Sequence, residues 1–284
     1  DEKPLSWDQL LLEVQSLFST TYHIRLPTSL ELSLDKMSNI ASSSNIPSKK
    51  LYDISEKNRQ QKLVRIVTQN VPVGIFPKHY TAKLYDISIC GEMPDYIIYN
   101  KHADLRKYIR RGTTLMSIDR NNSKKNMDVV LYANRKFTGN FGDDDDESLP
   151  GSYEIWRDYC IDKPDESEQI VAMEKLDGET AHFSGRFIDG NFYIITGSKN
   201  IHMLISCEED IEKYKGGRYE SARVIARVLW KYLMQMQKDK RQILFSLLHH
   251  TKCTVVCELL SPDHQRIKNF SSLNVNRNSL VTHI

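Results

Sequence analysis

The stretch "HFSGRFIDGNFYIIT" (residues 182–196) indicates most directly how the chain folds. Two runs rich in aromatic and β-branched residues flank the pair Asp189-Gly190, which is a strong short-range signal for a two-residue β-hairpin. The stretch therefore predicts two antiparallel strands. The segment "MEKLDGE" (173–179) stands just before them, so Lys175 is expected at the entrance of an antiparallel sheet.

Strands and helices are predicted on both sides of this hairpin. Short runs of β-branched and aromatic residues predict strands at 96–99, 113–118, 128–133 and 253–262. Apolar residues at helical spacing predict a helix over 4–18, with Ser6 as its N-cap, and another over 219–237. The expected fold class is α+β, with antiparallel sheets flanked by helices and preceded by a helical N-terminal segment.

The Ser- and Asn-rich stretch "KMSNIASSSNIPSKK" (36–50) is typical of an exposed loop or linker. We therefore expect residues 1–75 to form a helical segment and linker, and residues 76–284 to form the main domain. In the helix over 219–237, the stripe predicted to face the core consists of Val224, Val228, Leu229, Tyr232, Leu233 and Met236. Met234 is also expected to fill space in the core.

The composition is that of an ordinary globular protein, with 284 residues, 40% hydrophobic content, a net charge of +2 and a mean hydropathy of −0.49. No run approaches the roughly 18 apolar residues of a membrane span, and no basic region followed by an apolar stretch opens the chain. Five cysteines at irregular spacing argue against a disulfide framework. We expect a cytoplasmic or nuclear protein with free thiols and no membrane partner.

Positive charge is concentrated between residues 100 and 125, where eight Lys or Arg stand against two acidic residues. Such an excess can bind phosphates, and Arg106, Lys107 and Arg110 are its candidates for contact with a nucleic acid. The alternative is a solvated face of a helix and its following loop.

Lys175 begins the pattern K-x-D-G, which Asp177 and Gly178 complete. A lysine amine can attack the α-phosphorus of a nucleoside triphosphate, release pyrophosphate and form a phosphoramidate. The amine must first lose its proton, and nearby cations and a divalent metal ion would lower its pKa from the ordinary value of ~10.4. Asp177 could orient the lysine or contact the sugar, and Gly178 would let the backbone approach the nucleotide. These few letters alone are a weak pattern, so the rest of the chain must supply the context.

Glu258 and three histidines are further candidates. Strand alternation places Glu258 on one face with apolar residues, which is costly for a carboxylate unless the group is paired or in use. The alternative for Glu258 is an edge-strand charge that faces water. His182, His202 and His264 have no spacing that marks a catalytic triad or a metal site, so they are predicted to be structural or surface residues.

Five short motifs follow one another along the chain: "RRGTTLM" (110–116), "RKFTGN" (135–140), "EKLDGE" (174–179), "GSKN" (197–200) and "CELLSPDHQRI" (257–267). In this order they resemble the successive motifs of the phage-type and tRNA-splicing RNA ligases, which are covalent nucleotidyltransferases related to DNA ligases and mRNA capping enzymes. The resemblance implies a nucleotidyltransferase fold, ATP and Mg²⁺ or Mn²⁺ as cofactors, and RNA with 5′-phosphate and 3′-hydroxyl ends as substrate. It also implies a monomer with a role in RNA repair or tRNA splicing.

The resemblance assigns roles residue by residue. Lys175 would be the nucleophile that accepts the nucleotide. Arg111 and Lys199 would bind phosphates of the triphosphate, and Lys136 would contact the nucleotide. Glu258 would contact the ribose or a metal-bound water.

Several positions depart from the family pattern. Thr138 stands where the family has a second aromatic residue, and Asn200 replaces a common glycine. The family's later glutamate–glycine–hydrophobic and lysine-x-lysine motifs do not follow Glu258, so the sequence is expected to be part of a longer protein. Two alternatives remain, a catalytically silent RNA-binding or interaction protein with the same fold, and a DNA ligase or capping enzyme. Thr180 stands where those enzymes have an arginine, which favours the RNA ligase.

Overall fold

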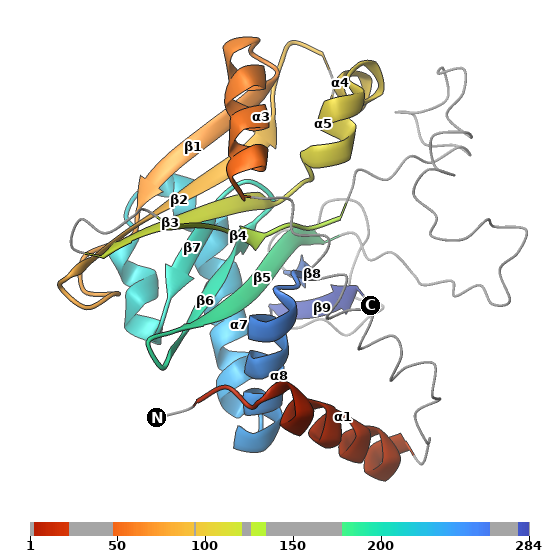
Figure 1. Cartoon of the computed structure of the whole chain (residues 1–284), viewed down its shortest axis with the longest axis vertical. Helices are drawn as coiled ribbons and strands as arrows, with labels where there is room; N and C mark the ends of the chain where they lie inside the picture. The colour runs from red at the N-terminus through yellow and green to blue at the C-terminus, as the bar shows by residue number, and fades with distance from the viewer. Residues whose placement is uncertain are drawn as a thin grey trace, which may run out of the picture.

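Two antiparallel β-sheets, A and B, pack on each other, and helices cover their outer faces (Figure 1). The computed structural model describes residues 3–22, 48–93, 95–120, 126–134, 178–261 and 278–283. The class is therefore α+β with antiparallel sheets, as predicted. No helix in the described part of the chain is both long enough and apolar enough to cross a bilayer.

Sheet A has the strand order β1-β2-β3-β4. Its strands are β1 (Val64–Asn70), β2 (Tyr80–Ile89), β3 (Thr113–Arg120) and β4 (Asn126–Leu131). Its helices are α3 (Ser48–Gln60), α4 (Asp95–Lys101) and α5 (Ala103–Tyr108). One buried apolar cluster joins helices and sheet, with Leu51, Ile98, Leu105 and Leu115 among its members. Since β1 pairs with β2, this sheet extends to both sides of residue 75.

Sheet B has the strand order β7-β6-β5-β8-β9. Its strands are β5 (Glu179–Ile188), β6 (Asn191–Ser198), β7 (His202–Ile205), β8 (Val255–Leu260) and β9 (Ser279–His283). Its helices are α7 (Glu220–Gln235), α8 (Lys238–Thr251) and the short 3₁₀ turns η2 (Glu208–Lys213) and η3 (Gly217–Tyr219). The main apolar core lies between sheet B and α7 and α8, and it continues into the interface with sheet A.

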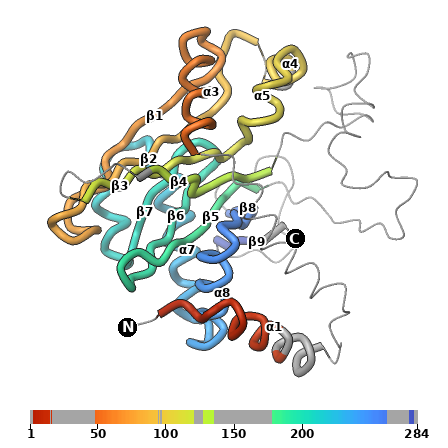
Figure 2. Tube along the Cα trace, viewed as in Figure 1, coloured from red at the N-terminus to blue at the C-terminus, as the bar shows by residue number. Residues whose placement is uncertain are grey.

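The N-terminal helix α1 (Trp7–Tyr22) lies beside the late helix α8, although the two are far apart in sequence (Figure 2). The Leu5 backbone N–H donates to Ser246 Oγ at 2.9 Å, which ties the chain start to α8. Ser6 caps the helix as predicted, because the Gln9 backbone N–H donates to Ser6 Oγ at 3.2 Å. The Gln9 side chain accepts in return from the Ser6 backbone N–H at 2.9 Å, completing a capping box.

The hairpin prediction is confirmed. Asp189 and Gly190 connect β5 to β6 and have φ angles of 49° and 81°, the left-handed pair that a type I′ turn requires. The strands predicted at 113–118, 128–133 and 253–262 are also confirmed, as β3, β4 and β8.

The strand predicted at 96–99 is wrong, because this segment lies in helix α4. Its apolar letters fit a strand, but a run of four residues is too short to reveal a helical period. The buried residues Ile98 and Tyr99 pack against sheet A from the helix.

Helix α7 is confirmed, but its predicted core face is rotated. The buried residues are Ala222, Ile225, Ala226, Leu229 and Leu233, whereas Tyr232 and Met234 are each 42% exposed. The small alanines allow α7 to lie close to sheet B, and an apolar-letter pattern gives them little weight.

Strand β5 presents two different faces. His182 and Arg186 lie on the face of β5 toward sheet A, where His182 meets His202 of the same sheet and Arg186 meets Asp128 of β4. Phe187 on the opposite face contacts the ring of His249 in α8. The polar side chains of β5 therefore lie at the interface between the sheets, while its apolar side chains pack against the helices.

Candidate functional site

A cavity of about 510 Å³ lies where the β6–β7 turn of sheet B meets β1, the end of β2 and the segment before β3. Arg111 and Lys199, the two predicted phosphate ligands in the described chain, both line it. Its charged lining residues are Arg65, Asp95, Arg110, Arg111 and Lys199. Four of these five are cations, so the cavity suits an anionic ligand.

Arg111 is held at this cavity from two directions. Its Nη2 lies 2.5 Å from Oδ2 of Asp95, and both side chains are about one-third exposed. The next residue, Gly112, has a φ of 68°, and a Cβ there would lie 2.4 Å from an atom of the His182 ring. Glycine is therefore required for the chain to pass from Arg111 into β3 along this path.

Lys199 is carried by a tight turn between β6 and β7. The backbone N–H of Ser198 donates to the carbonyl of Ile201 at 3.1 Å, and Lys199 is exposed. A Cβ on Gly197 would lie 2.1 Å from the Ile201 carbonyl oxygen, so the turn folds directly over β6. The lysine therefore stands on a closely packed support at the cavity.

Glu258 lies inside sheet B and is only 6% exposed. Strand β8 pairs with β5 on one side and β9 on the other, so the alternative of an edge-strand charge facing water is wrong. Thr180 of β5 is its cross-strand partner, and a Cβ on Gly178 would lie 3.1 Å from the Cβ of Glu258. The carboxylate is therefore next to the glycine that completes the K-x-D-G pattern.

His182 connects these parts. It is 1% exposed on β5, and its ring lies against Gly112, the residue after Arg111. Its cross-strand partner on β6 is Gly197, two residues before Lys199. Burial and then the neighbouring His202 lower the pKa of His182 to about 3, so the ring is neutral at physiological pH.

Six predicted site residues remain to be accounted for. Lys175, Asp177 and Lys136 lie outside the described residues. Arg110 lines the cavity with its guanidinium 4.1 Å from the centre of the Tyr132 ring. Lys107 is exposed on α5 and Arg106 is half-buried on the same helix, and neither is among the residues that line the cavity.

Sequence reasoning missed the polar network behind the cavity. His182 and His202 are buried, as a structural role requires, but they also join Asp86, which no pattern singled out. An acidic residue in the strand-like stretch "YTAKLYDISI" (80–89) was the available signal. Its partners, however, come from other strands and cannot be read from local spacing.

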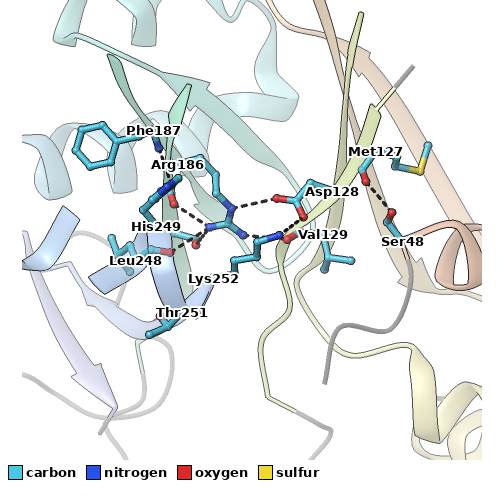
Figure 3. A network of polar contacts seen from close by, with 12 residues as sticks. Ser48, Met127, Asp128, Val129, Arg186, Phe187, Leu248, His249, Thr251 and Lys252 are labelled. Carbon is cyan, nitrogen blue, oxygen red and sulfur yellow. Dashed lines mark hydrogen bonds and ion pairs between the residues drawn. The ribbon is translucent and has the colours of Figure 1, made fainter. Parts of the chain in front are cut away.

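A larger cavity of about 750 Å³ lies between sheet A and the β5–β6 hairpin. Figure 3 shows a contact at this cavity, in which Arg186 of β5 pairs with Oδ2 of Asp128 in β4, while Lys252 pairs with Oδ1 of the same carboxylate. Arg186 also donates to Ser184 Oγ at 2.9 Å and to the Val129 carbonyl at 2.9 Å. Arg186 and Lys252 share the one carboxylate of Asp128, and the buried Arg186 thereby joins the two sheets.

The thiol of Cys257 is not a candidate nucleophile. Burial and then the adjacent Glu258 raise the pKa of Cys257 to about 12, so its thiol is protonated and a poor nucleophile. Among the residues that the structure describes, no three His, Cys, Asp or Glu side chains cluster closely enough to hold a metal ion. Glu258 packs against Gly178, and a single carboxylate suits a Mg²⁺ ion held mainly by substrate phosphates.

The chain matches no protein-family model, no curated protein sequence and no solved structure.

Proposed function

We propose that this chain is the nucleotidyltransferase part of an ATP-dependent RNA ligase. Lys175 attacks the α-phosphorus of ATP, the bond to the β-phosphate oxygen breaks, and pyrophosphate leaves. The resulting lysyl-AMP passes its AMP to an RNA 5′-phosphate. The 3′-hydroxyl of a second RNA end then attacks that phosphate, and AMP leaves as the phosphodiester bond forms.

One observation carries this proposal: strand β5, which follows the Lys175 motif, contacts all three other described motif segments. Gly178 packs against Glu258, His182 packs against Gly112, and Ala181 pairs with Ser198. The segments were chosen from their order in the sequence, and they are far apart along the chain. Their meeting around the first residues of β5 is what a shared site requires.

The charges of the cavity suit the proposed chemistry. A triphosphate carries several negative charges, and Arg65, Arg110, Arg111 and Lys199 offer four cations to it. The same cations favour the neutral amine of a nearby lysine and so lower its pKa, which the attack requires. When bound, Mg²⁺ would screen the phosphates further, and Glu258 is the described residue proposed to help hold it.

Aromatic and cationic side chains around Arg110, which lines the cavity, support RNA as the partner. The amines of Lys50 and Lys107 lie 5.2 and 5.4 Å from the centre of the Tyr108 ring. The Tyr132 hydroxyl donates to the Tyr108 carbonyl at 3.1 Å, and the Arg110 guanidinium stacks on Tyr132. Rings and cations in this alternation bind the bases and phosphates of a single strand.

The test is transfer of label from ATP carrying a radioactive α-phosphate, with Mg²⁺ present. Wild-type protein should acquire acid-labile label and pass it to 5′-phosphorylated RNA. Lys175→Ala should acquire none, and Lys199→Ala should need more ATP for the same labelling. Lys231→Ala, which changes an exposed lysine of α7 outside the cavity, is the matched control and should behave as wild type.

The outcomes separate the alternatives. Equal labelling of wild type and Lys175→Ala would refute the assigned nucleophile. Labelling without transfer to RNA, but with transfer to nicked DNA or to a diphosphate RNA end with GTP, would indicate a DNA ligase or a capping enzyme. Absence of labelling together with RNA binding would favour the catalytically silent protein.

A further inference from the structure

Buried polar side chains lead from the interface between the sheets to the cavity of Arg111 and Lys199. Asp86 of β2, His202 of β7 and His182 of β5 are 2%, 1% and 1% exposed. Burying such groups is costly unless each finds partners. We propose that these three residues form a relay of positioning residues, which holds Arg111 and Lys199 where the phosphates bind. The phosphate-binding role of Arg111 and Lys199 in this proposal rests on the proposed function.

The inner end of the relay is anchored at Asp86. Its Oδ1 accepts from Nδ1 of His202 at 2.8 Å and from Oγ1 of Thr114 at 2.9 Å. Its Oδ2 accepts from Nε2 of Gln69 at 3.0 Å and from the His202 backbone N–H at 3.3 Å. The carboxylate therefore fixes both the ring and the main chain of His202, and it fastens β7 of sheet B to sheet A.

The outer end of the relay is His182. Nε2 of His202 lies 3.4 Å from Nδ1 of His182. The His182 ring also lies against Gly112, the residue after Arg111, and His182 pairs with Gly197, two residues before Lys199. A ring held on one side by His202 thus supports the neighbours of both cations.

The Lys199 turn is held by the relay at both of its ends. Gly197, just before the turn, pairs with both His182 and His202, and His202 directly follows Ile201, which closes the turn. The carbonyl of His202 also accepts from Nε2 of Gln69 at 2.5 Å. Any movement of the relay would therefore shift the turn relative to Arg111, and a shift of about 1 Å in a positioning group can cost up to ~100-fold in rate.

The neutral state of His182 fits this role. Burial and the neighbouring His202 keep the ring uncharged, so it supports the backbone without adding a fifth positive charge beside the cations. An apolar side chain of similar size would fill the same space but could not bond His202. This difference makes the role testable.

The primary experiment is hydrogen–deuterium exchange of the full chain without ATP, read in peptides covering 197–203 and 109–114. The variants are His182→Leu, which removes the hydrogen bond to His202, His182→Gln, which can keep it, and Asp86→Asn, which removes the anchoring charge. Ser184→Ala is the matched control, because Ser184 is fully buried on the same face of β5 and does not belong to the relay.

His182→Leu and Asp86→Asn should speed exchange in these two peptides by about tenfold or more, while peptides from α7 and α8 stay protected as in wild type. His182→Gln should stay closer to wild type. Unchanged exchange in both variants would overturn the relay. So would a uniform increase over the whole chain that Ser184→Ala reproduces, because that pattern reports only lost global stability.

A second readout connects the relay to the cavity. In the self-labelling assay, the ATP concentration for half-maximal labelling should rise about tenfold in Asp86→Asn, with a smaller change in maximal rate. If wild type labels through Lys175 but Asp86→Asn labels identically, the relay fails and the proposed function stands. If wild type does not label but the exchange pattern appears, the proposed function fails and the relay stands.

Discussion

Acidification is expected to destabilise this fold through His182. Burial, and then His202, lower the pKa of His182 from the ordinary 6.5 to about 3 in the folded protein. As the pH falls through 6.5, the unfolded chain takes up a proton at this histidine, whereas the folded chain does not until about pH 3. The unfolded state therefore holds more protons in this range. The stabilisation is complete above pH 6.5 and is lost progressively as the pH falls toward 3.

The size of the effect follows from the shift. One pH unit of differential proton binding corresponds to about 1.36 kcal/mol. Between about pH 7.5 and about pH 5, His182 alone should remove roughly 2 kcal/mol from the free energy of unfolding. That is a large part of the roughly 5–15 kcal/mol by which domains are stable.

The assay is urea unfolding at these two pH values for wild type and His182→Gln. Carboxylates and His249, whose pKa is lowered mainly by burial, contribute in both proteins, so they largely cancel in the comparison. Wild type should lose about 2 kcal/mol more than the variant on acidification. Parallel losses in the two proteins would mean that His182 is protonated in the folded state near its ordinary pKa, and the reasoning would be refuted.

Four further substitutions test the packing. Arg186→Met should destabilise the fold by about 3 kcal/mol, because removal of this buried cation leaves five acceptors without their donor. Arg120→Met, which removes an exposed ion pair, should cost less than about 1 kcal/mol. Urea unfolding of both variants measures the difference. Gly112→Ala should cost at least about 1–2 kcal/mol from its positive φ alone, and more from the clash with His182. Gly190→Ala should cost about 1 kcal/mol, measured by thermal unfolding, because its hairpin turn has positive φ but open space around it.

The elements that the sequence predicts correctly are those encoded locally. Asp189 and Gly190 supply the backbone angles of the turn wherever the hairpin sits, and α7 is long enough to show its period. The segment 96–99 has neither a turn signal nor sufficient length, so tertiary packing of Ile98 and Tyr99 decides its conformation. Helix α8 was missed because its first turn is charged and its last turn holds His249 and His250, which leaves a short apolar stretch between them.

The environment of Glu258 could not be predicted for a different reason. Its burial depends on β9, a strand formed by residues 279–283 that pairs on the far side of β8. Those five residues show no alternation of apolar and polar side chains strong enough to indicate a strand. An edge position and a central position therefore looked alike from the sequence of β8, although they differ in whether water reaches the carboxylate.

The contacts around the candidate site depend on strand register, and the Asp189-Gly190 turn sets that register. With the turn at these two residues, His182 is opposite Gly197, and Gly197 is opposite His202. A slip of one residue would turn His182 away from sheet A and separate it from His202, because neighbouring side chains on a strand point to opposite faces. The same slip between β5 and β8 would remove Thr180 from Glu258. The short turn that determines the hairpin thus also determines which motif segments meet at the cavity.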